Sequence, residues 1–147
     1  MIQIHKMTIQ DLNQISNILN TEFDDFWNEN LLKSEIENPN SKCIMAKNKD
    51  EIVGFACIWK AVDDIHITNI VVKKIYRKQG IGSLLLKELL EISYKENVNS
   101  VTLEVKDSNL PAQNLYAKYG FKVLGRRKKY YNGVEDAIIM TKDLKCE

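Results

Sequence analysis

Hydrophobic and polar positions in the first forty residues predict one strand and two helices. Residues 2–6 alternate as in a strand, and Thr8 followed three residues later by Asp11 resembles the capping box that opens a helix. The apolar residues after it fall on one helical face: Ile9, Leu12, Ile15 and Leu19. A second helix is expected from Asn30 to Glu37, because Pro39-Asn40-Ser41 would end it.

The next apolar runs are rich in β-branched residues and predict an antiparallel meander. Strands are expected over residues 43–47, 52–60 and about 65–72. Asn48 to Glu51 would form the tight hairpin between the first two.

The second half of the chain changes to a strand, helix, strand pattern. A leucine-rich helix is expected to run to about Glu96, followed by a strand at residues 100–105, and such a crossover forms a right-handed parallel unit. Ser108 or Asn109 would cap another helix to Tyr119, with Gly120 as the left-handed residue after it. Strands at residues 121–129 and 134–142 would close the chain as a hairpin. The predicted fold class is α+β, with a mixed, mostly antiparallel central sheet and helices on both faces.

Arg77-Lys78-Gln79-Gly80-Ile81-Gly82 joins the third predicted strand to the leucine-rich helix and reads as an anion-binding turn. Glycines allow positive φ and close approach of the backbone, and a helix N-terminus carries unpaired N–H groups and about half a positive charge. A plain strand-to-helix turn is the alternative. A P-loop is excluded because no Lys follows Gly82, and a dinucleotide fingerprint because Leu85 stands where a third glycine belongs.

Composition favours one soluble cytoplasmic domain over residues 1–147, since this length can bury roughly two-thirds of the unfolded surface. The 21 basic and 20 acidic residues give no bias toward nucleic acid. Three cysteines cannot all pair, and neither they nor His5 and His66 have the spacing of metal ligands. No signal peptide or membrane-length apolar stretch is recognised.

Three motifs in order make a resemblance specific. The glycine turn is followed by Leu103-Glu104-Val105, and then by Asn109, Ala112, Leu115-Tyr116 and Gly120-Phe121 in the pattern N-x-x-A-x-x-L-Y-x-x-x-G-F. This series resembles the GNAT superfamily of acetyl-CoA-dependent N-acyltransferases, and within it the RimI branch of ribosomal-protein-alanine N-acetyltransferases. The likeness covers nearly the whole chain and implies the GNAT fold, in which two parallel strands splay apart at the cofactor site.

The resemblance assigns acetyl-CoA as co-substrate, with no metal. It implies that the pantetheine arm bonds to the backbone of Ile70, Val71 and Val72, whose side chains are ordinary core residues. The same resemblance assigns the pyrophosphate and neighbouring contacts to Arg77, Lys78, Gln79, Gly80, Ile81, Gly82, Ser83 and Asn109. Asn109 is equally expected as a plain helix cap.

Two residues match the catalytic positions of the family. Alternation places Glu104 on the face opposite Leu103 and Val105, and the resemblance makes it the proton acceptor for the incoming amine, directly or through a water. Tyr116 would donate a hydrogen bond or a proton to the departing thiolate. Alternatively, Glu104 is a solvent-facing strand residue and Tyr116 is a packed core tyrosine.

By the resemblance, the acceptor would lie between two pairs of aromatic residues, Tyr130 with Tyr131 and Phe26 with Trp27. Adjacent tyrosines on a strand are as often one inward and one outward, and core burial explains Phe26 and Trp27 equally well. A peptide α-amine with a pKa near 8 costs about 1 kcal/mol to neutralise at pH 7, against about 4 to 5 kcal/mol for lysine. One glutamate is an adequate base for neutralising the peptide α-amine, but a poor sole base for lysine. The sequence therefore predicts acetylation of a protein N-terminus, such as the alanine of a small-subunit ribosomal protein. A GNAT enzyme acting on lysine or small amines and a non-catalytic acyl-CoA-binding module remain the alternatives.

Overall fold

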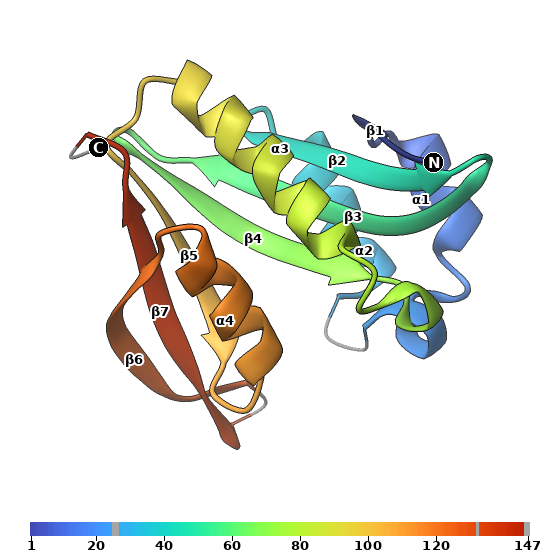
Figure 1. Ribbon diagram of the computed structural model, residues 1–147. Helices are drawn as coiled ribbons and strands as arrows, with labels where there is room; N and C mark the ends of the chain where they lie inside the picture. Colours follow the sequence, from blue (N-terminus) through green and yellow to red (C-terminus); the bar gives the residue numbers. More distant parts are fainter. Residues whose placement is uncertain (25–26, 132, 146–147) are drawn as a thin grey trace.

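The computed structural model describes residues 1–24, 27–131 and 133–145. One seven-stranded sheet has the order β1-β2-β3-β4-β5-β7-β6 (Figure 1). The strands are β1 Ile2–Lys6, β2 Ser41–Asn48, β3 Glu51–Lys60, β4 Asp64–Val72, β5 Ser100–Lys106, β6 Lys122–Tyr131 and β7 Glu135–Asp143. The helices are α1 Ile9–Ile15, the π-helical turn η1 Leu19–Phe23, α2 Glu29–Glu37, the 3₁₀ turn η2 Lys74–Tyr76, α3 Ile81–Lys95 and α4 Leu110–Lys118.

The predicted capping box opens α1. The Thr8 hydroxyl accepts from the Asp11 N–H, and the Asp11 carboxylate accepts from the Thr8 N–H at 2.8 Å. The predicted helix is too long, because α1 ends at Ile15 and Leu19 belongs to η1. Leu19 is nevertheless buried in the same cluster as Leu12, so the apolar pattern identified the buried face although the backbone changes its winding.

The parallel contact between β4 and β5 is short. The two strands pair only from Asp64 with Ser100 to Ile67 with Leu103, and then diverge. Beyond that point β4 stays paired with β3, while β5 stays paired with β7 as far as Lys106. Figure 1 shows the resulting V between the two halves of the sheet. We call this region beyond Ile67 and Leu103 the splay.

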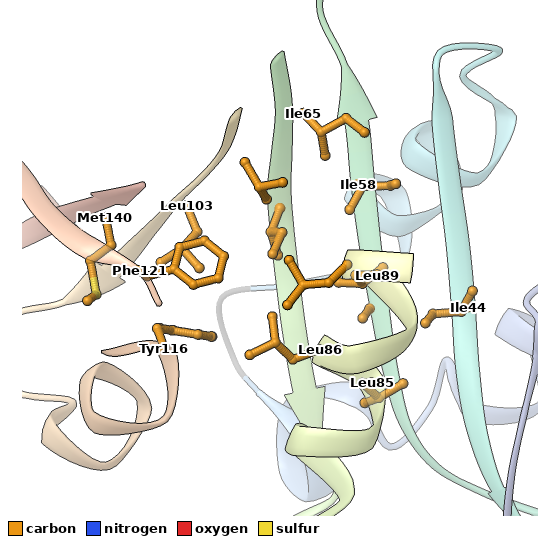
Figure 2. Packing of buried hydrophobic residues seen from close by; sticks show 14 of the residues in the cluster. Ile44, Ile58, Ile65, Leu85, Leu86, Leu89, Leu103, Tyr116, Phe121 and Met140 are labelled. Carbon is orange, nitrogen blue, oxygen red and sulfur yellow. The ribbon is translucent and has the colours of Figure 1, made fainter. Parts of the chain in front are cut away.

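Two hydrophobic clusters cover the two faces of the sheet. One lies under α3 and α4 and contains Leu85, Leu86 and Leu89, each with no exposed surface. Burial of each such side chain contributes roughly 1.5–3 kcal/mol. Figure 2 shows this cluster bridging both arms of the sheet, from Ile44 on β2 to Met140 on β7. The other cluster lies under α1, η1 and α2. We call the face that it covers the acceptor face.

The predicted fold class is confirmed, including helices on both faces and one splayed parallel pair. The order of the last three strands did not follow from the sequence pattern. β7, not β6, pairs with β5, so the final hairpin is inserted with its second strand inward.

Candidate active site

The splay leaves one edge of β4 without a strand neighbour. Ala56 of β3 pairs with Ile70, and Gly54 with Val72, but nothing on β5 pairs with either residue. Unpaired strand edges present N–H and C=O groups to any extended ligand. Ile70 to Val72 therefore lie where the sequence analysis expected a backbone-binding edge.

Glu104 lies on β5 at the mouth of the splay and points to the acceptor face. Val101, Leu103 and Val105 are buried in the cluster under α3 and α4, so the alternation of a strand turns Glu104 to the other side. A carboxylate at the opening of the sheet, away from its apolar neighbours, can reach a ligand that enters from the α1 and α2 side.

The two oxygens of Glu104 have different surroundings. Oε1 lies 3.5 Å from the Arg127 guanidinium of β6, whose plane also stacks over the Tyr130 ring at 5.4 Å. Oε2 is buried and makes no hydrogen bond within the described residues. One oxygen is thus held and the other is available to accept a proton. The sequence analysis assigned no role to Arg127, whose contact with Glu104 depends on the bulged pairing of β6.

Tyr116 lies on the opposite side of the splay from Glu104. It projects from α4 into the cluster under α3 and α4, where it packs against Phe121 at 5.9 Å between ring centroids (Figure 2). Burial raises the pKa of Tyr116 to about 12. Full proton transfer to a thiolate of pKa near 8.5 would be uphill by about 5 kcal/mol, so the phenol is suited to donating a hydrogen bond rather than its proton.

The glycine turn ends in an uncapped helix N-terminus. Gly80 is the N-cap of α3 with φ of 84°, and as a glycine it has no side chain that could cap the first turn. The first intrahelical bond runs from the Leu84 N–H to the Gly80 carbonyl at 3.1 Å, which leaves the N–H groups of Ile81, Gly82 and Ser83 outside the helical pattern. Lys78 also has positive φ, at 64°. This backbone matches the expected anion-binding turn.

Positive φ was expected to be available at both glycines of the turn, but only one of the two uses it. The φ of Gly80 is positive and that of Gly82 is not. A Cβ at Gly82 would lie 3.7 Å from a Leu115 methyl group and 3.9 Å from a Val72 methyl group, which is ordinary contact distance. Gly82 thus lies beside Leu115 of α4 and Val72 at the end of β4, with room for one methyl group.

Arg77 of the glycine turn and Lys73, just after β4, both contact residues of η1. Arg77 donates to the Val72 carbonyl at 3.0 Å and to the Phe23 carbonyl at 2.7 Å. The buried Lys73 pairs with Glu51 at 2.8 Å and with Glu22 at 3.2 Å, and its pKa is raised, chiefly by the Glu51 hydrogen bond. The Arg77 guanidinium is therefore engaged with main-chain oxygens, a role that its motif position did not reveal.

Asn109 and Ser83 both make structural contacts. The Asn109 side chain accepts from the Ala112 N–H at 3.2 Å and so caps α4, which is the plain helix cap expected from the sequence. The Ser83 hydroxyl hydrogen bonds to the Tyr119 hydroxyl and links α3 to the end of α4. Gln79 lies in the turn, with its amide 3.5 Å from the Ile75 carbonyl.

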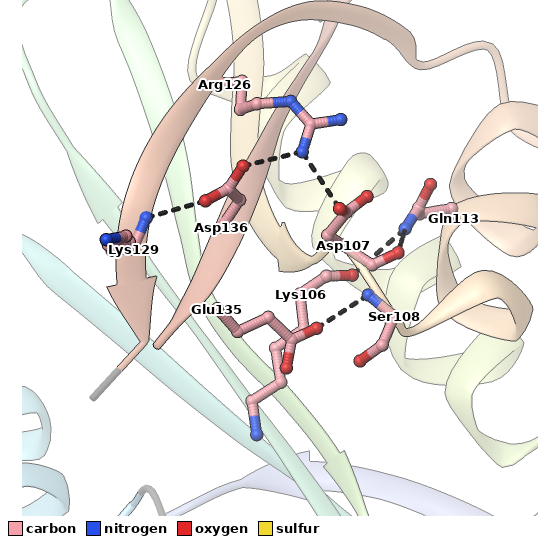
Figure 3. Close-up of polar contacts among 8 residues, drawn as sticks. All are labelled: Lys106, Asp107, Ser108, Gln113, Arg126, Lys129, Glu135 and Asp136. Atoms are coloured by element: carbon pink, nitrogen blue, oxygen red, sulfur yellow. Dashed lines mark hydrogen bonds and ion pairs between the residues drawn. The ribbon is translucent and has the colours of Figure 1, made fainter. Parts of the chain in front are cut away.

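A polar network fastens the turn after β5 to the last hairpin (Figure 3). Arg126 bridges Asp107 at 3.0 Å and Asp136 at 2.9 Å, and the Ser108 N–H donates to Glu135 at 2.7 Å. Each exposed pair contributes little alone, but together they fix the hairpin beside Glu104.

The expected aromatic walls are described in part. Trp27 packs, half-buried, against the cluster of the acceptor face, the face to which Glu104 points. Tyr130 is about half exposed and stacks with Arg127. Phe26 and the side chain of Tyr131 lie outside the described residues.

Within residues 1–24, 27–131 and 133–145, no group of three or more His, Cys, Asp or Glu side chains is arranged to hold a metal ion. In the same part of the chain, no helix has the length and apolar character required to cross a bilayer.

A mixed sheet splayed beside a glycine-opened helix defines an N-acetyltransferase fold. The sequence profile of the acetyltransferase (GNAT) family matches residues 12–121, and the chain belongs to this family. A Bacillus subtilis protein named "Putative [ribosomal protein bS18]-alanine N-acetyltransferase" is 35% identical over 140 residues, which is 93% of this chain and 92% of the relative.

Solved structures of N-acetyltransferases have the same fold as this chain. The crystal structure of the ribosomal-protein-S18-alanine N-acetyltransferase from Escherichia coli has a TM-score of 0.88 and 30% identity, covering 98% of this chain and 94% of that one. Arabidopsis thaliana NAA60 in complex with acetyl-CoA, at 20% identity over 99% of both chains, has a TM-score of 0.84 and shares the fold.

Proposed function

We propose that this chain, acting as one domain over residues 1–147 in the cytoplasm, transfers the acetyl group of acetyl-CoA to a protein N-terminal α-amine. The proposed acceptor is the N-terminal alanine of the small-subunit ribosomal protein bS18. The Bacillus subtilis and Escherichia coli relatives, which carry that activity in their names, support this acceptor.

The observation that carries the proposal is Oε2 of Glu104, which is buried at the mouth of the splay and makes no hydrogen bond within the described residues. An incoming peptide ammonium would give this oxygen its proton, directly or through a water, and become a nucleophile. Neutralising an α-amine of pKa near 8 at pH 7 costs about 1 kcal/mol, whereas a lysine would cost about 4 to 5 kcal/mol. A single carboxylate is adequate for the first and a poor sole base for the second.

The cofactor is proposed to lie across the splay. Its pyrophosphate would accept from the N–H groups of the glycine turn, and its pantetheine arm would bond to the open edge of β4 at residues 70–72. The Val71 carbonyl lies toward Gly54 of β3, so Ile70 and Val72 face the open edge; because Arg77 already donates to the Val72 carbonyl, Ile70 and the Val72 N–H would supply most of that edge.

The reaction then follows in three steps. The neutral amine attacks the thioester carbonyl and forms the C–N bond, giving a tetrahedral oxyanion. Collapse of that intermediate breaks the C–S bond, and the leaving thiolate accepts a hydrogen bond from Tyr116. The proton that the ammonium gave to Glu104 passes to solvent, and the nitrogen of the tetrahedral intermediate gives up a second proton that reaches the leaving thiolate through water, so the products are the acetylated peptide and the thiol of coenzyme A.

The proposal is tested with peptides of equal length that differ only in the first residue, which is Ala, Ser, Gly or Leu. Initial rates are measured by mass spectrometry, with the acetyl position read from fragment ions. We expect N-terminal acetylation, fastest for Ala and slow for Leu. Absence of N-terminal acetylation on every peptide would contradict the proposed function.

A further inference from the structure

Three buried side-chain atoms in the described part of the chain make no hydrogen bond, and they belong to two residues. They are Nδ2 and Oδ1 of Asn69 and Oε2 of Glu104. Asn69 is 6% exposed. Buried polar groups are hydrogen-bonded in the large majority of cases, because an unmet group keeps its full desolvation cost, so a carboxamide with both ends unmet requires an explanation.

Asn69 shares the acceptor face with Glu104. It pairs in register with Cys57 on the neighbouring strand, and residues directly opposite on antiparallel strands share a face. Cys57 and Val71 both belong to the cluster under α1, η1 and α2. Asn69 lies two positions beyond Ile67, the last β4 residue that pairs with β5, and Glu104 directly follows Leu103. The two residues therefore flank the splay on its acceptor side.

The chemistry of a carboxamide indicates what would satisfy it. Asn offers a donor and an acceptor side by side, which match the N–H and C=O groups of an extended peptide. Burial raises the pKa of the adjacent Cys57 thiol and Asn69 offsets part of that rise, but a thiol is only a weak hydrogen-bond partner. Because a carboxamide is not basic, it would not compete with Glu104 for the proton of the amine.

We propose that Asn69 is an acceptor-binding residue whose carboxamide hydrogen bonds to the main-chain groups beside the α-amine and directs that amine toward Oε2 of Glu104. This inference rests on the proposed function, because it requires a peptide in the splay. It also gives the site a means of preferring peptides over simple amines, which lack an adjacent amide.

The test compares Asn69→Leu, which is nearly isosteric and apolar, with the wild type. KM and kcat are measured for the Ala-initiated peptide, acetyl-CoA affinity is measured by calorimetry, and stability by thermal unfolding. Asn69→Ala serves as the second variant if the larger side chain impairs folding. Thr102→Val is the matched control. Thr102 lies on the same face of β5 as Glu104, and its hydroxyl already forms a hydrogen bond with the Thr141 hydroxyl at 3.2 Å.

We expect Asn69→Leu and Asn69→Ala to raise KM for the peptide by about tenfold or more, the usual consequence of losing one or two hydrogen bonds. Acetyl-CoA affinity should be unchanged, Asn69→Leu should unfold at the wild-type temperature or above, and Thr102→Val should keep the wild-type KM. An unchanged KM would overturn the inference. Weaker acetyl-CoA binding at unchanged KM would also overturn it and assign Asn69 to the cofactor.

The two proposals fail in different ways. If the wild type acetylates the peptide N-terminus and the Asn69 variants do so with the same KM, only the inference about Asn69 is wrong. If the wild type acetylates simple amines but no peptide N-terminus, the proposed function is wrong and the role of Asn69 falls with it.

Discussion

The glycine turn and the acceptor face meet at the splay but are built in different ways. The turn is a continuous stretch, residues 77–83, and offers mainly backbone N–H groups set by one left-handed glycine. The acceptor face gathers side chains from distant strands: Asn69 from β4, Glu104 from β5, and Arg127 with Tyr130 from β6. A backbone site can be written in a short motif, whereas a side-chain site depends on how the strands pair. Substitutions should therefore separate cofactor binding from transfer.

The largest effect is expected for Glu104→Gln. The amide cannot accept the proton of the amine, so kcat should fall by roughly 10² or more. Acetyl-CoA affinity, measured by calorimetry, should not change. The loss should shrink as pH rises through about 8, because the α-amine then loses its proton to solvent. A variant within a few-fold of wild-type kcat would exclude Glu104 as the base.

Tyr116→Phe should lower kcat by about 10² without altering acetyl-CoA affinity, because it removes only the hydrogen bond to the leaving thiolate. Unlike Glu104→Gln, its loss should not recover at high pH. Rapid-quench measurement of a single turnover checks this. If full activity survives, Tyr116 serves the core packing with Phe121 alone.

Gly82→Val should weaken acetyl-CoA binding rather than the transfer step. A branched side chain would crowd the space beside Leu115 and Val72 at the start of α3, and the affinity for acetyl-CoA should fall by about tenfold, or about 1.4 kcal/mol. Gly82→Ala is the matched control, since its single methyl group has room at 3.7 Å. Equal calorimetric affinities for the valine variant and the wild type would remove this stretch from the cofactor path.

The buried phenol of Tyr116 should also affect alkaline stability. With a pKa raised to about 12 in the fold, the protonated form is favoured there, so its contribution is full below the unfolded pKa near 10 and is lost as pH rises to 12. Between pH 8 and 11, the wild type should lose about 1 kcal/mol more of its free energy of unfolding than Tyr116→Phe. Urea unfolding of both proteins measures the difference. Identical losses would mean that the ring does not titrate as a buried group.

Arg127→Met should have the smallest effect. The exposed guanidinium holds Oε1 of Glu104 across 3.5 Å, and exposed pairs contribute up to about 1 kcal/mol, so kcat should fall about fivefold or less. Added salt should reproduce part of that loss in the wild type. If Arg127→Met keeps the wild-type kcat and added salt does not lower kcat of the wild type, Glu104 does not depend on its ion pair with Arg127.

The sequence predicted most of the fold because its signals were local. The capping box at Thr8, the left-handed Gly120 after α4 and the alternating strands each depend on a few adjacent residues, and the structure has all of them. The helix predicted through Leu19 was wrong, because α1 ends at Ile15 and a π-helical turn follows without a Gly or Pro to mark it.

The side-chain contacts of the site were harder to predict. Glu104 and Tyr116 were found through motifs, and strand alternation placed Glu104 on the correct face. The pairing of Arg127 with Glu104 was not predictable, because it requires β7 to lie between β5 and β6. Asn69 lies within the strand predicted over residues 65–72 and received no role of its own there, because the absence of a hydrogen-bond partner among the described residues is a property of the packed structure.

The most direct test of the central claim is a competition between two peptides at equal concentration. One has a free N-terminal alanine, and its twin has a blocked N-terminus and an internal lysine. We predict that acetyl-CoA-dependent transfer to the alanine peptide is more than about 100-fold faster, because the lysine amine is harder to neutralise by about 3 kcal/mol. Comparable acetylation of the blocked twin would contradict the account and make this chain a lysine or small-amine acetyltransferase.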